Sequence, residues 1–282
     1  MIKMSEISPF AIPLFMAFVF CLWVLPSGAQ QCTIKEIKRR PNTGFNNTKE
    51  FTISYPIIAT GVDYIDKKIN AKIRSVLIVE DDKKLPIGQA LDAEISESFI
   101  VEMSYTVTLC KHHIISMYVT TQGCGAYCST WAAYFNFNWK NGELLSLEDM
   151  LNEDGLRVFR DTVSKHKLKA LADYKNEMNK QLVSAEVDSD DYKWAMEEVN
   201  ENCINSLSTK DFSLSGVDIE VFDGCDFPHA IQSLAPDYKL RYPYSFLKQN
   251  LDYTVTNLKH DSNRGSRCRL AVLGPVSLST GQ

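Results

Sequence analysis

FIVEMSYTVTLCKHHIISMYVTTQGCGAYCSTWAAYFNFNWKNGELLSL, residues Phe99 to Leu147, is the stretch that decides the fold of this chain. Apolar and polar residues alternate along three of its segments. The apolar members are Val101, Met103, Tyr105, Val107 and Leu109, then Ile115, Met117 and Val119, and finally Trp131, Ala133, Phe135, Phe137 and Trp139. Alternation with period two is typical of β-strands that bury one face and expose the other to water.

Turn signals separate these segments. Lys111-His112-His113 fits a tight turn between the first and second strands. Asn141-Gly142 predicts a type I′ hairpin turn, in which both central residues have positive φ. The short run Leu144–Leu147 then returns along the third strand. The sequence therefore predicts an antiparallel β-meander of three or four strands.

Helical and extended segments flank the meander, so the expected fold class is α+β. Residues 51–58 are extended, and Asp63 is expected to cap a helix that carries Ile65, Ile69 and Ile73 at helical spacing. The later expected elements are a helix over 154–178, a second helix with acidic cap residues at 188–191, a hairpin over 212–222, a strand over 238–242 and a short helix over 243–251.

The N-terminus indicates export. Phe10–Leu25 is an uncharged apolar run of 16 residues, shorter than the roughly 20 residues that span a bilayer as a helix. Small residues follow at Ser27-Gly28-Ala29, which predicts a signal peptide over 1–29 that is cleaved after Ala29. An uncleaved anchor is the alternative. Cleavage leaves no stable membrane span, and the mature protein would be periplasmic or extracellular.

Composition limits the possible partners. Hydrophobic residues make up 45% of the 282-residue chain and charged residues 23%, which is typical of a globular protein. The net charge is −5, which gives no electrostatic basis for binding nucleic acid. Residues 30–50 are polar and basic and are expected to form a leader or a short edge strand. Residues 259–282 are expected to form a flexible tail.

Seven cysteines follow the predicted cleavage site, and in an exported protein most of them are expected in disulfides. An odd number leaves at least one free or bonded between chains. A Cys32–Cys268 bond would tie the termini together, and a Cys203–Cys225 bond would tie a helix to the next strand. Cys124 and Cys128 are expected in disulfides that fix their loop, with a metal site or a reactive thiol as the less favoured alternatives.

No motif in the chain indicates catalysis. A Gly-x-Ser-x-Gly nucleophile motif is absent. Glu148-Asp149 is the best candidate for a pair of catalytic carboxylates, although a cap at a helix entry is the favoured interpretation. The aromatic row from Trp131 to Trp139 is expected to pack in the core, and the alternative is a platform for sugars. The opposite face of that strand, with Tyr134 and Asn136, is a plausible exposed binding surface.

Several short motifs appear in a familiar order. They are Tyr55-Pro56, Ile69-Asn70, Tyr105-Thr106-Val107, Gly123-Cys124-Gly125-Ala126, Tyr134-Phe135-Asn136-Phe137, Leu144–Met150 and Tyr242-Pro243-Tyr244. This order resembles the RsiV-like extracellular domain family, a domain of unknown function. It forms the outer part of the lysozyme-sensing anti-sigma factor RsiV and precedes PdaC-type peptidoglycan deacetylase domains. The resemblance implies two lobes, over 51–142 and 143–258.

The resemblance also implies a function in binding. Many members have a Gly-Gly-Ala-His-like turn where this chain has Gly123–Cys128, with two cysteines and no histidine. We expect an exported, non-enzymatic protein without cofactor or metal, whose ligand is lysozyme, another cationic protein or a cell-wall glycan. The alternatives are a hydrolase of envelope polysaccharide and a structural envelope protein with an inter-chain disulfide. The residues expected to bind the ligand are Gly123, Gly125, Ala126, Tyr127, Tyr134 and Asn136.

Overall fold

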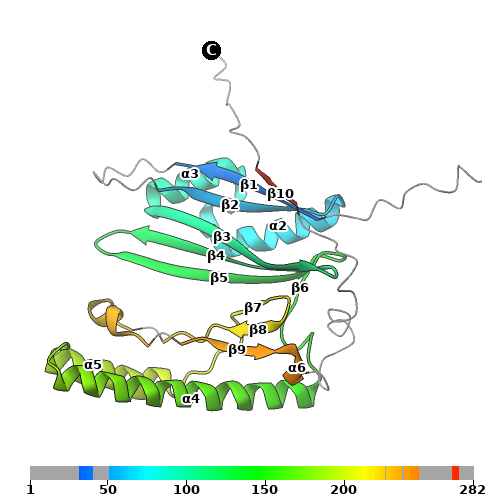
Figure 1. Ribbon diagram of the computed structural model, residues 1–282. Helices are drawn as coiled ribbons and strands as arrows, with labels where there is room; N and C mark the ends of the chain where they lie inside the picture. Colours follow the sequence, from blue (N-terminus) through cyan, green and yellow to red (C-terminus); the bar gives the residue numbers. More distant parts are fainter. Residues whose placement is uncertain (1–31, 41–50, 226, 237, 248–268, 273–282) are drawn as a thin grey trace, which may run out of the picture.

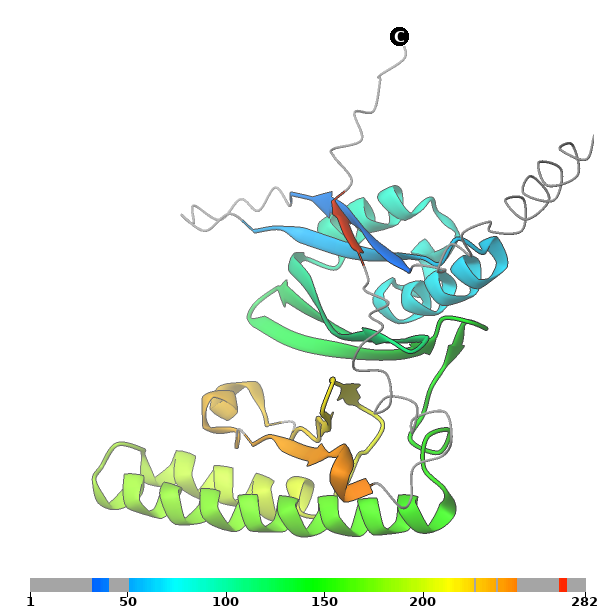
Figure 2. The same ribbon diagram turned by 45° about the vertical axis from the view of Figure 1, so that its right-hand side comes forward.

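The computed structural model describes residues 32–40, 51–225, 227–236, 238–247 and 269–272. The predicted signal peptide lies outside this part of the chain. Two helices cover one face of a seven-stranded sheet, and a three-stranded sheet lies against the other face (Figure 1). Two further helices cover the outer side of the small sheet, as the rotated view also shows (Figure 2). The fold is therefore α+β, as the sequence predicts.

The large sheet has the strand order β10-β1-β2-β3-β4-β5-β6, and the small sheet has the order β7-β8-β9. The strands are β1 (Thr33–Arg39), β2 (Ile53–Ala59), β3 (Ile100–Lys111), β4 (Ile114–Cys124), β5 (Cys128–Asn138), β6 (Glu143–Leu144), β7 (Phe212–Leu214), β8 (Asp218–Val221), β9 (Leu240–Pro243) and β10 (Arg269–Val272). The α-helices are α2 (Asp63–Leu77), α3 (Ile87–Glu97), α4 (Glu153–Val183), α5 (Ser189–Glu198) and α6 (Tyr244–Leu247). Shorter helical segments are η1 (Glu80–Lys84), η2 (Val199–Cys203) and η3 (His229–Leu234).

The antiparallel β3-β4-β5 meander forms the centre of the large sheet. Its first turn is the predicted one, since His112 and His113 both have positive φ, of 51° and 69°. The second turn differs from the prediction. Only Gly142 has positive φ, of 72°, and its amide donates to the carbonyl oxygen of Asn138 at 2.8 Å, so the loop is longer than a two-residue type I′ turn. A side chain at Gly142 would also press on Lys68, which lies 3.2 Å from an added Cβ.

A first hydrophobic core lies between the large sheet and the helices α2 and α3. Ile69 and Ile73 of α2 are fully buried against Phe137 of β5. The helix is present as predicted, but its N-cap residue is Val62. Asp63 lies one residue inside the helix, where it pairs with Lys67 at 2.9 Å. Helix α3 was not predicted from the sequence.

A second hydrophobic core lies between the small sheet and α4, and a third one lies between α4 and α5. Phe159 of α4 packs edge-on against Tyr242 of β9, with ring centroids 5.0 Å apart. Helix α4 begins where Asn152 accepts a hydrogen bond from the Gly155 amide at 2.8 Å, and it extends five residues beyond the predicted end. A buried ion pair between Lys167 and Asp223, at 2.7 Å, ties α4 to the chain that follows β8.

The two terminal segments contribute strands to the large sheet. β1 lies within the predicted leader, pairs with β2 along seven residues and places Ile34 in the first core. β10 lies within the predicted flexible tail and pairs in parallel with β1. These residues therefore belong to the sheet, because β1 supplies both a paired backbone and a buried side chain. Within the described part of the chain, no helix is both long and apolar enough to cross a membrane.

Candidate functional site

The polar face of the meander is an interface inside the molecule. Asn136 of β5 is 3% exposed, and its Nδ2 donates to the carbonyl oxygen of Phe212 in β7 at 2.9 Å. The Leu214 amide of β7 donates to Ser116 Oγ of β4 at 2.8 Å. The sequence placed Asn136 on an exposed binding surface. That expectation is wrong, because the small sheet covers this face and the Asn136 side-chain amide donates a hydrogen bond to the backbone of that sheet.

Tyr134 also belongs to this interface. Its ring stacks on Phe222, with centroids 4.3 Å apart and an interplanar angle of 20°. Burial raises the pKa of the Tyr134 hydroxyl above its ordinary value, and the nearby Asp211 carboxylate adds to the shift. Tyr134 is only partly exposed and its ring face is occupied by Phe222. Its position indicates packing between the two sheets.

The end of the β4-β5 hairpin, residues 123–128, is different, and we call it the hairpin tip. A Cys124–Cys128 disulfide closes it, with Cα atoms 4.0 Å apart, as the sequence predicts. The Cys124 amide donates to the carbonyl oxygen of Phe99 at 3.0 Å, which joins the tip to the start of β3. Phe99 has a φ of 54°, an arrangement that costs a non-glycine residue about 1–3 kcal/mol. The tip is therefore tied both covalently and through the backbone.

The hairpin tip exposes aromatic side chains on both sides. Tyr127 is 67% exposed and lies against His229 of η3, with ring centroids 4.4 Å apart. Trp131 is 48% exposed and lies over Gly123, where an added Cβ would be only 3.0 Å from the indole ring. Phe99, beside the tip, is 59% exposed. Gly123 is thus needed for the position of Trp131.

The sequence identified the tip but not all of its neighbours. Gly123, Gly125, Ala126 and Tyr127 lie together in it as expected, although Gly123 is only partly exposed. Trp131 was expected in the core with the other aromatic residues of β5. It lies near the start of β5 beside the hairpin tip and is exposed, whereas Phe135, Phe137 and Trp139 further along the chain are buried.

Two further residues at the tip were missed. Phe99 begins the alternating stretch, but nothing in its sequence context marks it as exposed. His229 is about a hundred residues away in sequence and reaches the tip only through the packing of η3, where its Nε2 lies 3.3 Å from the carbonyl oxygen of Cys128. No local sequence signal could have identified that contact.

The other cysteines give one confirmed bond and one correction. The Cys203–Cys225 disulfide joins η2 to the chain after β8, as predicted. Cys110 is also disulfide-bonded. Cys32 is a free thiol that is 3% exposed in the first core, so the expected Cys32–Cys268 bond is wrong. Burial, and to a smaller extent the charge of Asp66, raises the pKa of Cys32 to about 12.

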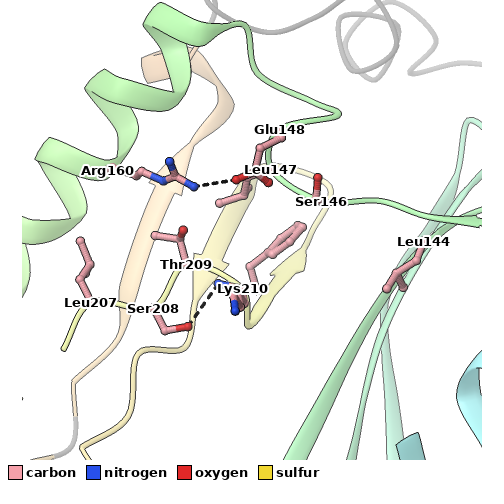
Figure 3. A pocket seen from close by; sticks show the side chains of 10 residues that line it. Leu144, Ser146, Leu147, Glu148, Arg160, Leu207, Ser208, Thr209 and Lys210 are labelled. Carbon is pink, nitrogen blue, oxygen red and sulfur yellow. Dashed lines mark hydrogen bonds and ion pairs between the residues drawn. The ribbon is translucent and has the colours of Figure 1, made fainter. Parts of the chain in front are cut away.

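Glu148 and Asp149 do not face a common site. Asp149 accepts hydrogen bonds from the amide and hydroxyl of Ser146, both at 2.8 Å, and so caps the turn before α4. Glu148 pairs with Arg160 of α4 at 2.6 Å and lines a cavity of about 670 Å³ (Figure 3). Among the described residues, no group of three or more His, Cys, Asp or Glu side chains is placed to hold a metal ion.

Comparison with known proteins finds similar solved structures but no match by sequence. No protein-family model and no curated protein matches the chain. A member of the DUF3298 family from Bacteroides fragilis aligns at 13% identity with a TM-score of 0.49, over 82% of this chain and 98% of that chain. A DUF3298 family protein from Pseudomonas aeruginosa aligns at 13% identity with a TM-score of 0.47, over 79% and 95%. DUF3298 is a domain of unknown function.

Proposed function

We propose that this chain is an exported, non-enzymatic binding protein that recognises its ligand with the hairpin tip. The ligand is a lysozyme-like cationic protein or a cell-wall glycan. The observation that carries the proposal is the disulfide-closed end of the β4-β5 hairpin, which holds Tyr127 and Trp131 exposed on a rigid support. Loops held by a rigid scaffold are common sites of recognition.

Rigidity favours binding at this place. A loop that is already fixed loses little conformational entropy when a ligand binds, so more of the contact energy appears as affinity. Tyrosine and tryptophan bury a large area at the cost of few rotatable bonds, and they are enriched among the residues that dominate binding energy. Tyr127 and Trp131 have this character, and they are 67% and 48% exposed in the free protein.

The chemistry of the tip suits both ligand classes. The faces of aromatic rings attract lysine and arginine side chains, which a cationic protein presents. The same faces pack against the apolar side of a sugar ring. The net charge of −5 would also accelerate the approach of a cationic partner.

The two alternative functions have less support. A hydrolase would need two carboxylates at one site, whereas Asp149 caps a turn and Glu148 is held by Arg160. A structural protein with an inter-chain disulfide would need an accessible unpaired thiol. The Cys32 thiol is enclosed in the first core and would have to leave it to reach another chain.

Calorimetric titration of residues 30–282 with lysozyme at physiological salt, and then with soluble peptidoglycan fragments, tests the proposal. We expect saturable binding to one of them. Tyr127→Ala and Trp131→Ala should each weaken it by about tenfold or more, as expected for central aromatic contacts. Tyr64→Ala is the matched control, because Tyr64 is 66% exposed and lies at the start of α2, at the opposite end of the sheet.

Three results would overturn the proposal. One is the absence of binding to either ligand. Another is equal weakening by Tyr64→Ala and by the tip variants. The third is release of reducing sugar from peptidoglycan that Glu148→Gln abolishes, which would indicate a hydrolase instead.

A further inference from the structure

The cavity beside Glu148 is separate from the hairpin tip. It lies between β6, the turn that follows β6, the first half of α4 and the segment 207–212 (Figure 3). Its volume of about 670 Å³ falls in the range of small-molecule sites, about 300–1,000 Å³. The cavity could therefore enclose a small ligand.

Apolar side chains form the floor and part of the rim. Leu147 and Phe212 are almost fully buried and belong to the second core. Leu144 and Leu207 line the same cavity but remain 40% and 41% exposed. A ligand with an apolar body would remove these two leucines from water, which is favourable in proportion to the area covered.

The polar lining has an excess of positive charge. Arg160 and Lys210 line the cavity together with one carboxylate, that of Glu148. Glu148 binds one Nη of Arg160, so the other guanidinium N–H groups remain available as donors. Lys210 forms no close ion pair with another described residue, and the neighbouring Asp211, whose charge interacts with that of Lys210, does not line the cavity. The lining itself, with two cations and one carboxylate, therefore carries one net positive charge.

We propose that this cavity binds a small organic monoanion with an apolar body, such as an alkyl carboxylate. Lys210 and Arg160 hold the anionic group through charge-assisted hydrogen bonds. Thr209 also lines the cavity, and its hydroxyl is a further donor. The leucines and Phe212 contact the body. A cationic ligand would meet Lys210 and Arg160 while the carboxylate of the lining, Glu148, is already bound to Arg160, and a neutral ligand would gain no charge-assisted hydrogen bond.

Three probes with the same ten-carbon body and different charge test this inference on residues 30–282. They are decanoate, 1-decanol and decylammonium, each used below the concentration at which it aggregates. Calorimetry should give saturable one-to-one binding of decanoate, weaker binding of decanol and none of decylammonium. Lys210→Gln should weaken decanoate binding by about tenfold, because one charge-assisted hydrogen bond is lost.

Two further variants complete the test. Lys180→Gln is the matched control, since it removes an exposed cation near the far end of α4 and should leave binding unchanged. Leu207→Ser should weaken decanoate and decanol alike, because it removes rim contact without changing charge. Equal binding of decanoate and decylammonium, or decanoate binding unaffected by both Lys210→Gln and Leu207→Ser, would overturn the proposal. Unchanged melting temperatures would establish that each variant is folded.

Discussion

The two faces of the β4-β5 hairpin are both covered, but by different chemistry. On the side of α2 and α3, Met117 and Phe137 belong to the first hydrophobic core. On the side of the small sheet, Ser116 and Asn136 bind the backbone of β7, and Tyr134 stacks on Phe222. The first face is covered by a hydrophobic core, whereas the second adds side-chain-to-backbone hydrogen bonds to the apolar packing between two sheets.

This difference shows what alternation can and cannot establish. A polar residue at every second position is compatible with water, and it is equally compatible with a layer of protein that supplies hydrogen-bond partners. Here the partners are backbone groups 98 and 76 residues further along the chain. Because the small sheet covers the polar face, we place the proposed recognition surface at the uncovered tip.

The largest expected effect concerns the reactivity of Cys32 in the apolar core. The buried thiol has a raised pKa of about 12, so at pH 8 it is both enclosed and protonated. We expect its reaction with a soluble disulfide reagent to be about a thousandfold slower in the native protein than in denaturant, because it needs opening of the core. The slow phase should be missing in Cys32→Ser. Rapid labelling of the native wild type would contradict the burial of Cys32 in the first core.

The next effect is on stability, measured by urea unfolding. Phe137→Ala removes a fully buried ring from the apolar face and should lower the free energy of unfolding by about 3–5 kcal/mol. Trp131→Ala is the control from the same row of β5. Because Trp131 is about half exposed, its loss should cost much less. Similar costs for both variants would mean that the apolar face is not the core described above.

A smaller cost is expected on the polar face. Asn136→Ala leaves the carbonyl oxygen of Phe212 buried without its donor, which should cost about 1–3 kcal/mol. Thr130→Ala is the control, since Thr130 lies on the same face of β5 beyond the interface and is exposed. If both variants unfold at the urea concentration of the wild type, the contact between the sheets contributes nothing to stability.

The smallest effect is a change in alkaline stability. Burial raises the pKa of Tyr134 above its usual 10.0, so above pH 10 the unfolded chain releases a proton that the native protein keeps. The contribution of Tyr134 to the free energy of unfolding is therefore fully present below pH 10, and it is lost as the pH rises towards the pKa in the native protein. Between pH 10 and 11 the free energy of unfolding of the wild type should decrease, and Tyr134→Phe should make that decrease smaller by about 1 kcal/mol or less. An unchanged alkaline slope would place Tyr134 in water.

Much of the fold follows from local sequence, but the relations between distant segments do not. The three long strands, the His112-His113 turn and α2 were predictable because period-two and period-3.6 patterns are local properties. Helix α3 was missed because its short apolar pattern, with Ala90 and Leu91 buried, has no capping signal before it.

The candidate site divides in the same way. The loop with Cys124 and Cys128 was recognisable from spacing and turn residues, whereas the Cys203–Cys225 bond was one of two suggested pairings and was confirmed. The burial of Asn136 and the arrival of His229 depend on how the small sheet and η3 pack against the hairpin, and the exposure of Trp131 depends on its place near the hairpin tip. The free Cys32 was likewise unpredictable, because disulfide connectivity is a tertiary property.

The amide of Leu214 tests the central claim most directly. In β7 this amide points away from β8 and donates to Ser116 Oγ, so it meets water if the small sheet leaves the polar face of the meander. Measured by NMR hydrogen exchange, it should belong to the slowly exchanging amides of the wild type and lose its protection selectively in Ser116→Ala. Exchange at the rate of an unprotected amide in the wild type would contradict the covered face, and with it the assignment of recognition to the hairpin tip.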